Sequence, residues 1–234
     1  MNVSPVAGCA LVVMLGLSCA LAQPREAEGP AGAVPLSSRF GIAAGMGVSY
    51  VDAVDIVNVV NQDIEASEHV SQFRAGVDFF GAVVLPASED YCIKLEYAYL
   101  LFSYSGTTLY GVSGDFTVVA HLPTLVFQYV LRDEGLYNFK IGTGVGYHFG
   151  TFTRNYGAGE ERFSGAGPGI LLEIEGNSAL GDHLFANLVG NLRWDGIGAL
   201  TNSSGAGPVA TAGSPSARLH FFSLGARIGL SYYF

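Results

Sequence analysis

The titratable residues best placed to do chemistry are lysines, arginines and carboxylates that interrupt apolar segments. Lys94 and Glu96 are two residues apart, and so are Glu173 and Glu175, which puts each pair on one face if the segments are β-strands. Because charges in an apolar interior are costly unless they are paired, these groups should form ion pairs with one another. We expect a balanced ion network made up of Lys94, Glu96, Lys140, Glu173, Glu175 and Arg227.

Catalytic and metal-binding motifs are absent from the sequence. The histidines are scattered, and neither HExxH nor GxSxG occurs. The glycine-rich stretch 142–146 alternates along a strand pattern with no helix after it, so it is a weak candidate for phosphate binding. Only Cys92 follows the amino-terminal apolar run, so no second cysteine is available for a disulfide or a structural zinc site. We predict that the protein is not an enzyme and needs neither metal nor cofactor.

The overall composition is apolar and acidic. Of the 234 residues, 50% are hydrophobic and 13% are charged, with 11 basic against 20 acidic side chains. This composition excludes a disordered chain. It also argues against nucleic-acid binding, because phosphate contacts need clustered Lys and Arg.

The amino-terminal region carries the pattern of an export signal. Residues 10–22 form an apolar run that is shorter than a membrane-spanning helix and ends in the A-x-A site of Ala20 and Ala22. We predict a signal peptide over 1–22 and a flexible leader over 23–38, with processing and lipid attachment at Cys19 as the alternative.

From residue 39 onward the hydrophobic pattern has a period of two. In the first segment bulky apolar residues such as Ile42 and Met46 alternate with glycine and other small residues. The pattern recurs and predicts an all-β fold of eight strands, over 39–51, 70–85, 91–104, 115–131, 136–152, 166–176, 183–195 and 218–234.

Two features favour a membrane barrel over a soluble one of the lipocalin type. The face opposite the bulky residues is mostly glycine and alanine, which suits a narrow lumen and not a water-exposed wall. The connections also alternate between long and short, as they do when long loops face the exterior and short turns face the periplasm. We predict an eight-stranded antiparallel up-and-down transmembrane β-barrel over 39–234, with both termini on the periplasmic side.

The last segment supports this assignment. From His220 to Phe234 apolar residues alternate with small ones, and the chain ends in an aromatic residue. This strand resembles the closing strand of the small outer-membrane barrels of the OmpX and OmpW type. The resemblance implies a multi-pass protein of the bacterial outer membrane, surrounded by its lipids and recognised by the barrel-assembly machinery through the strand that ends at Phe234.

Inward residues differ between the two halves of the predicted barrel. The ion network falls in the periplasmic half, although its charges could also stand separately in lumen water. The outer half should contain an apolar cup, for which the resemblance to the OmpW branch implies passage of small hydrophobic compounds; ordinary core packing is the alternative. The candidate cup residues are Leu100, Phe102, Tyr104, Val189 and Phe221.

Strand 115–131 contains an apparent change of phase. Apolar residues fall on even positions before Pro123 and on odd positions after it. Because proline cannot donate to the ladder, we predict a β-bulge, and with it a candidate lateral opening, at His121, Leu122, Pro123 and Thr124.

Three functions remain open: a narrow route or binding site for small hydrophobic molecules, a surface protein that binds extracellular ligands through its loops, and a structural barrel with a plugged lumen. We favour the first. Loop 52–69 is acidic and loop 196–217 is rich in Gly, Ala and Ser, so either could contact a ligand. The sequence identifies neither a permeant nor an oligomeric state.

Overall fold

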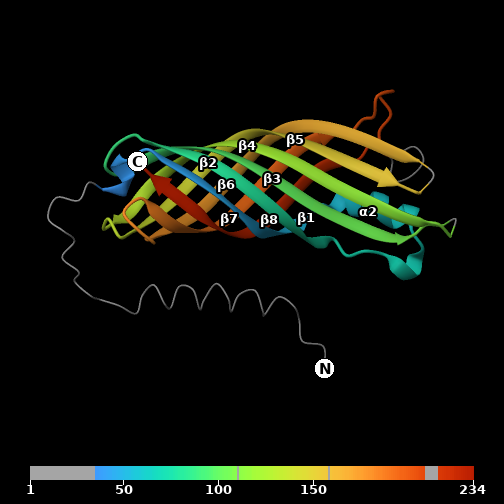
Figure 1. Ribbon diagram of the computed structural model, residues 1–234. Coiled ribbons are helices and arrows are strands. Elements are labelled where there is room, and N and C mark those ends of the chain that lie inside the picture. The colour runs from blue at the N-terminus through green and yellow to red at the C-terminus, as the bar shows by residue number, and fades with distance from the viewer. Residues whose placement is uncertain (1–34, 110, 158, 209–215) are drawn as a thin grey trace. The chain divides into compact units, whose positions relative to one another are not determined.

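The structure is a computed structural model that describes residues 35–234, except residues 110, 158 and 209–215. Its strands close into one barrel in which each pairs with its sequence neighbours and β1 also pairs with β8 (Figure 1). The eight predicted strands and the fold class are confirmed. The strands are β1 (Gly41–Asp52), β2 (Phe73–Pro86), β3 (Tyr91–Thr107), β4 (Ser113–Asp133), β5 (Tyr137–Asn155), β6 (Glu160–Ala179), β7 (Leu184–Ala199) and β8 (Arg218–Tyr233).

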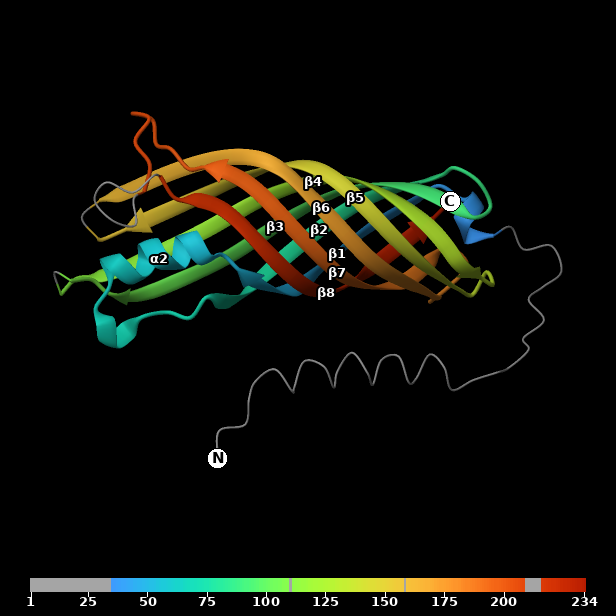
Figure 2. The same ribbon diagram turned by 180° about the vertical axis from the view of Figure 1, so that it is seen from behind.

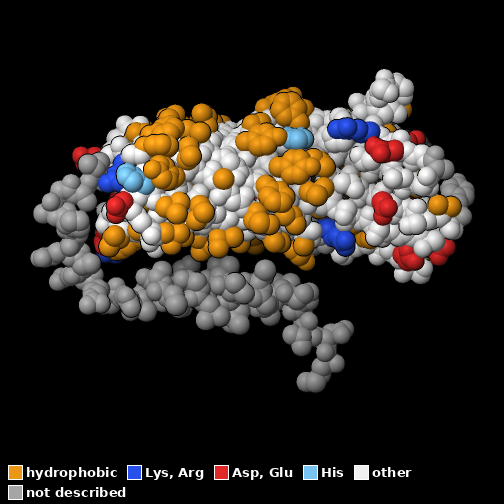
Figure 3. Space-filling model, viewed as in Figure 1, with side chains coloured by type: hydrophobic (Ala, Val, Ile, Leu, Met, Phe, Trp, Pro, Cys, Tyr) orange, Lys and Arg blue, Asp and Glu red, His pale blue; other side chains and the backbone are white. Residues whose placement is uncertain are grey.

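The bulky face of the wall points outward. Met46 is 49% exposed, Leu95 50% and Ile228 65%, although such residues are normally buried in water-soluble proteins. In Figure 3 these side chains form an apolar band between two ends that carry the charged groups. A soluble barrel is therefore excluded, because this band needs lipid around it. Aromatic residues line both edges of the band: Phe40, Tyr91, Tyr129, Tyr137, Tyr232 and Phe234 at the inner edge, and Tyr50, Tyr97, Tyr147, Phe149, Trp194 and Phe222 at the outer edge.

The predicted bulge at His121–Thr124 is wrong. The β3–β4 register runs without a shift through Tyr99 opposite His121 and Glu96 opposite Thr124. The register shifts in the wall lie between Val130 and Arg132 and between Ile197 and Ala199. No bulge is needed because β4 keeps its even residues inward throughout. At Pro123 the inward side chains of β4 change from apolar on the outer side to partly polar on the inner side.

A short helix occupies the outer mouth of the barrel. Helix α2 (Val54–Asp63) lies in the segment expected to be an acidic loop, and a 3-10 helix, η2 (Ala66–Glu68), follows it (Figure 2). Ile56 and Val60 of α2 are 0% exposed and belong to the same buried cluster as the inward residues of the outer wall. Among the described residues, no helix has the length and apolarity needed to span a membrane.

The inner end of the barrel is covered by residues that precede β1. A 3-10 helix, η1 (Leu36–Ser38), places Leu36 against Phe185 and Tyr233. The Ser37 backbone N–H donates to Asp133 at 2.8 Å. Residues 35–38 of the predicted leader thus pack against the barrel. The predicted signal peptide, the alternative processing site at Cys19 and the rest of the leader lie outside the described residues.

Close backbone packing at the β1–β8 seam generates the first prediction. A Cβ atom on Gly45 would lie 2.3 Å from the Ile228 carbonyl oxygen and 2.6 Å from the Gly229 Cα. Gly45→Ala should lower the free energy of unfolding in detergent or lipid by about 1–3 kcal/mol, because the seam must move to admit a methyl group. The matched control is Gly81→Ala on β2, where a Cβ would meet no atom within 4 Å. Equal urea midpoints for both variants would show that the seam is not tightly packed.

Candidate functional site: the filled lumen

Lys94 is the centre of an ion cluster in the inner half of the lumen. Its ammonium nitrogen lies 2.6 Å from Glu173, 3.1 Å from Glu175 and 3.2 Å from Glu96. Alternation places these side chains inward from β3 and β6, and all four residues are at most 3% exposed. The Gln128 amide donates to both Glu173 and Glu175 at 2.8 and 2.9 Å. The two neighbouring carboxylates are held together by this shared lysine and amide.

Glu96 links the cluster to two arginines. Arg193 donates to its Oε1 atom at 3.0 Å, and Arg227 donates to the same oxygen at 2.8 Å. Arg227 also donates through Nε to Asp78, which in turn accepts a hydrogen bond from Ser49 at 2.7 Å. Charges from β2, β3, β7 and β8 therefore meet across the lumen.

A third group closes the cluster toward the periplasmic end. Lys140 lies 3.7 Å from Glu175 and donates to the Tyr233 hydroxyl at 3.1 Å. Asn177 donates to Glu175 and to Asn138, both at 2.9 Å. The polar contacts thus continue from the centre of the barrel to the layer beneath η1.

The structure brings all six residues of the predicted network together. It adds Asp78 and Arg193, which the predicted network did not include. Both were recognisable as inward residues from their position in the alternation. Their position along the barrel axis depends on strand stagger, which a single sequence does not define. From here, "the ion cluster" means Asp78, Lys94, Glu96, Lys140, Glu173, Glu175, Arg193 and Arg227.

The outer half of the lumen is apolar and filled. Four of the five candidate cup residues, Leu100, Phe102, Tyr104 and Phe221, belong to the same buried cluster as α2. Val189 does not: it pairs with Glu175 and Arg227 and lies at the level of the ion cluster. The cup residues therefore pack against the wall and α2, so ordinary core packing describes them better than an open cup.

Polar contacts fix α2 and the segment after it to the strands. Asp63 accepts from Arg154 at 3.1 Å and from the Tyr156 hydroxyl at 2.7 Å. Glu68 accepts from the Thr107 hydroxyl at 3.1 Å. Burial and the hydrogen bond to Asp63 raise the pKa of the Tyr156 phenol above its usual range, so this contact persists across the ordinary pH range. Helix α2 is thus held in place by Arg154 of β5 and by Tyr156 just after it, and η2 is held by Thr107 of β3.

A buried hydroxyl, imidazole and carboxylate lie at the boundary between the two halves. His148 Nδ1 is hydrogen-bonded to Asp195, and its Nε2 lies 3.3 Å from the Thr124 hydroxyl. His148 and Asp195 are both 0% exposed and Thr124 is 4% exposed, so a substrate has no access to this hydroxyl. The arrangement can hold a proton but is not suited to attack a ligand.

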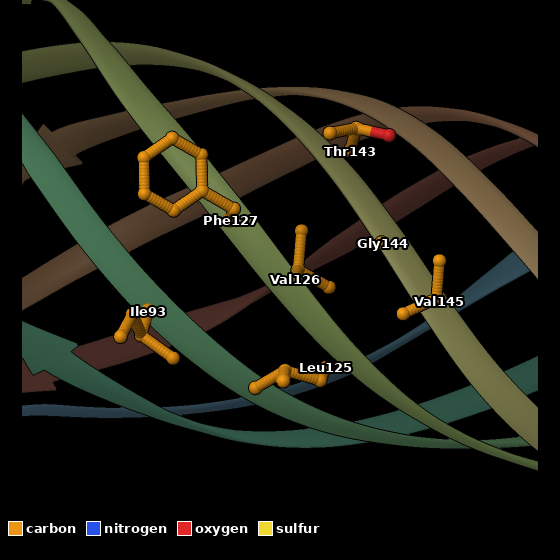
Figure 4. A pocket seen from close by; sticks show the side chains of 7 residues that line it. All are labelled: Ile93, Leu125, Val126, Phe127, Thr143, Gly144 and Val145. Carbon is orange, nitrogen blue, oxygen red and sulfur yellow. The ribbon is translucent and has the colours of Figure 1, made fainter.

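A hollow lies on the lipid-facing side of the wall. A depression of about 300 Å³ is lined by residues of β3, β4 and β5, including Ile93, Phe127 and Val145 (Figure 4). It forms where Thr143 and Gly144 leave little bulk between larger neighbours. It lies below the predicted lateral opening, whose residues His121–Thr124 form continuous wall with β3.

The ion cluster generates the second prediction. Glu96→Gln should destabilise the barrel by about 3–5 kcal/mol, because it leaves buried cations without their shared anion. The control is Glu134→Gln, which breaks an exposed pair with Arg132 and should change stability far less, because water screens that pair. Urea unfolding of both variants in lipid vesicles measures this difference. A loss in Glu96→Gln no larger than in the control would show that water solvates the cluster.

Comparison with known proteins agrees with this architecture. No protein-family model and no curated protein matches the sequence. Among solved structures, Neisserial surface protein A superposes with a TM-score of 0.50 at 9% identity, covering 83% of this chain and 97% of that one. The attachment invasion locus protein Ail of Yersinia pestis gives 0.45 at 10% identity, covering 84% and 99%. A major outer membrane protein of Thermus thermophilus gives 0.46 at 14% identity, covering 83% and 99%. The chain has the fold of the small eight-stranded outer-membrane barrels, as Neisserial surface protein A does, and its outward apolar band agrees with the predicted membrane location.

Proposed function

We propose that this barrel is a sealed membrane anchor that holds a rigid surface at the cell exterior, where it binds extracellular partners. The observation that supports this most is the filling of the lumen. Side chains of the ion cluster occupy its inner half, and α2 with the aromatic wall residues occupies its outer half. A solute would have to displace both layers to pass.

The shape of the outer end supports a display role. Strands β3–β6 have 17 to 21 residues and extend past the outer aromatic edge, so the β3–β4 hairpin rises roughly 20 Å above Tyr99. At its tip Leu109 is 63% exposed and Val112 46% exposed. The Thr108 backbone N–H donates to the Val112 carbonyl oxygen at 2.8 Å, so Leu109 and Val112 lie on one turn and offer a small apolar contact surface to a partner.

Passage of small hydrophobic molecules is the second candidate. The apolar character of the outer half favours it, because displacement of α2 would expose Phe102 and Phe221 to the exterior. The ion cluster beneath would still block a route to the periplasm, so such a molecule would have to leave sideways through the wall.

Uptake of a hydrophobic dye separates these two functions. Proteoliposomes with the wild-type barrel should take up the dye no faster than empty vesicles, because the two layers fill the lumen. Phe102→Ala tests whether dye uptake depends on the aromatic side chains in the outer half of the lumen. Wild-type uptake above the empty-vesicle rate that falls in Phe102→Ala would favour permeation over our proposal.

Adhesion tests the display role directly. Cells that carry the Leu109→Ser and Val112→Ser double variant should bind several-fold less than wild type to at least one member of a panel of immobilised glycans and extracellular-matrix proteins. The control is Leu136→Ser, which changes a residue 55% exposed on a periplasmic turn. Equal binding by all three kinds of cell, at the level of cells without the barrel, would contradict an adhesive surface.

A further inference from the structure

A hydroxyl group interrupts the apolar outer face of β5. Thr143 is exposed between Ile141 and Val145, and it lies six residues from Tyr137 at the inner aromatic edge and six from Phe149 at the outer edge. Because the two aromatic edges mark the limits of the hydrocarbon layer, Thr143 lies close to the middle of that layer. Its side chain is therefore at the depth where the membrane holds the least water.

The Thr143 hydroxyl has no hydrogen-bond partner among the described residues. Lipids at this depth offer only methylene and methyl groups, and water does not reach the hydrocarbon interior. A hydroxyl can both donate and accept a hydrogen bond, so leaving it unpaired in this medium costs free energy. A polar group of another membrane-embedded chain at the same depth would remove that cost.

The wall has a different shape on the two sides of this hydroxyl. The lipid-facing hollow lies on its β4 side, where Val126 and Gly144 are part of the lining (Figure 4). On its β6 side, Leu172 is paired with Thr143 in the ladder and is 51% exposed. A depression therefore lies on one side of Thr143 and a projecting apolar side chain on the other.

These features complement one another when two copies of the chain face each other across a two-fold axis. An axis beside Thr143 and normal to the membrane sets the β4 side of each copy against the β6 side of the other. Leu172 of each copy then meets the hollow of the other. The two Thr143 hydroxyls meet at the axis, where one donates to the other. A second copy thus supplies the hydrogen-bond partner that lipid does not.

The surface around Thr143 is also large enough for a stable interface. Six apolar side chains that surround it are each 47–62% exposed: Leu125, Phe127, Ile141, Val145, Tyr147 and Leu172. Together they present on the order of 700 Å², which is within the area that each partner contributes to a standard protein interface. Other parts of the apolar band offer a similar area, so the hydroxyl and the hollow are what select this face.

From the hydroxyl, the hollow and the area together, we infer that the β4–β6 face around Thr143 is a homodimer interface inside the membrane. Both copies have the same orientation in the membrane, so their outer ends lie side by side at the exterior. The interface does not depend on the proposed display function. It joins two outer surfaces in one unit whatever those surfaces bind.

Oxidative cross-linking in membranes tests the contact. Thr143→Cys, made in a chain that also carries Cys92→Ala, should form a disulfide-linked dimer several-fold faster than Met46→Cys in the same background, because a disulfide needs Cα atoms within about 7 Å. Met46 is the matched control: it is 49% exposed and lies on β1, opposite β5 in the closed ring of strands. Equal rates for the two variants would overturn the inference.

Counting of photobleaching steps in lipid vesicles tests the role of the hydroxyl without a new cysteine. Wild type should bleach mainly in two steps per fluorescent spot, and Met46→Val should keep that pattern. Thr143→Val, which removes the hydroxyl and keeps the shape, should shift the spots several-fold toward one step. Single-step bleaching of wild type at every protein-to-lipid ratio would contradict a dimer. A phospholipid that native mass spectrometry finds on wild-type monomers and not on Thr143→Phe would assign the hollow to lipid instead and would also overturn the inference.

Discussion

The width of an eight-stranded barrel is the constraint on which the rest of this structure depends. Such a lumen is barely wide enough for the side chains of its own wall, so every inward residue must pack against or pair with another. Where two strands approach closely, as β1 and β8 do at Gly45 and Gly229, only glycine fits. Where charged residues point inward, they must find partners or cost free energy. The filled lumen follows from this geometry and not from any single plug.

The two halves of the lumen meet this constraint differently. In the inner half, carboxylates and cations share oxygens, as Glu96 does with Arg193 and Arg227. In the outer half, where β3 extends beyond its pairing with β2 and β6 beyond its pairing with β7, α2 supplies Ile56 and Val60 to the core. His148 lies at the boundary between the polar inner half and the apolar outer half of the lumen. A protein built in this way presents only its ends and its lipid-facing wall to other molecules.

The sequence predicted the strands well because a period of two is a strong local signal. It failed on β4, since Phe116 and Leu122 were read as lipid-facing residues although the predicted cup already implied the apolar nature of the outer lumen. That nature depends on α2, and α2 had a signal: Ile56, Val57, Val60 and Ile64 follow helical spacing within the supposed acidic loop. Six members of the ion cluster were predicted from charge and alternation, whereas Asp78 and Arg193 required the strand stagger. The partnership of His148 with Asp195 joins two strands far apart in sequence, which no single chain pattern shows.

The side chains that fill the lumen should close it from end to end. Single-channel recording of the refolded wild-type protein in a planar bilayer measures whether they do. A closed lumen should give no current steps above those of the bare bilayer at any applied voltage that leaves the bilayer intact. Reproducible steps that scale with the amount of inserted barrel would contradict it, because ions would then be crossing a lumen that the ion cluster and α2 should fill.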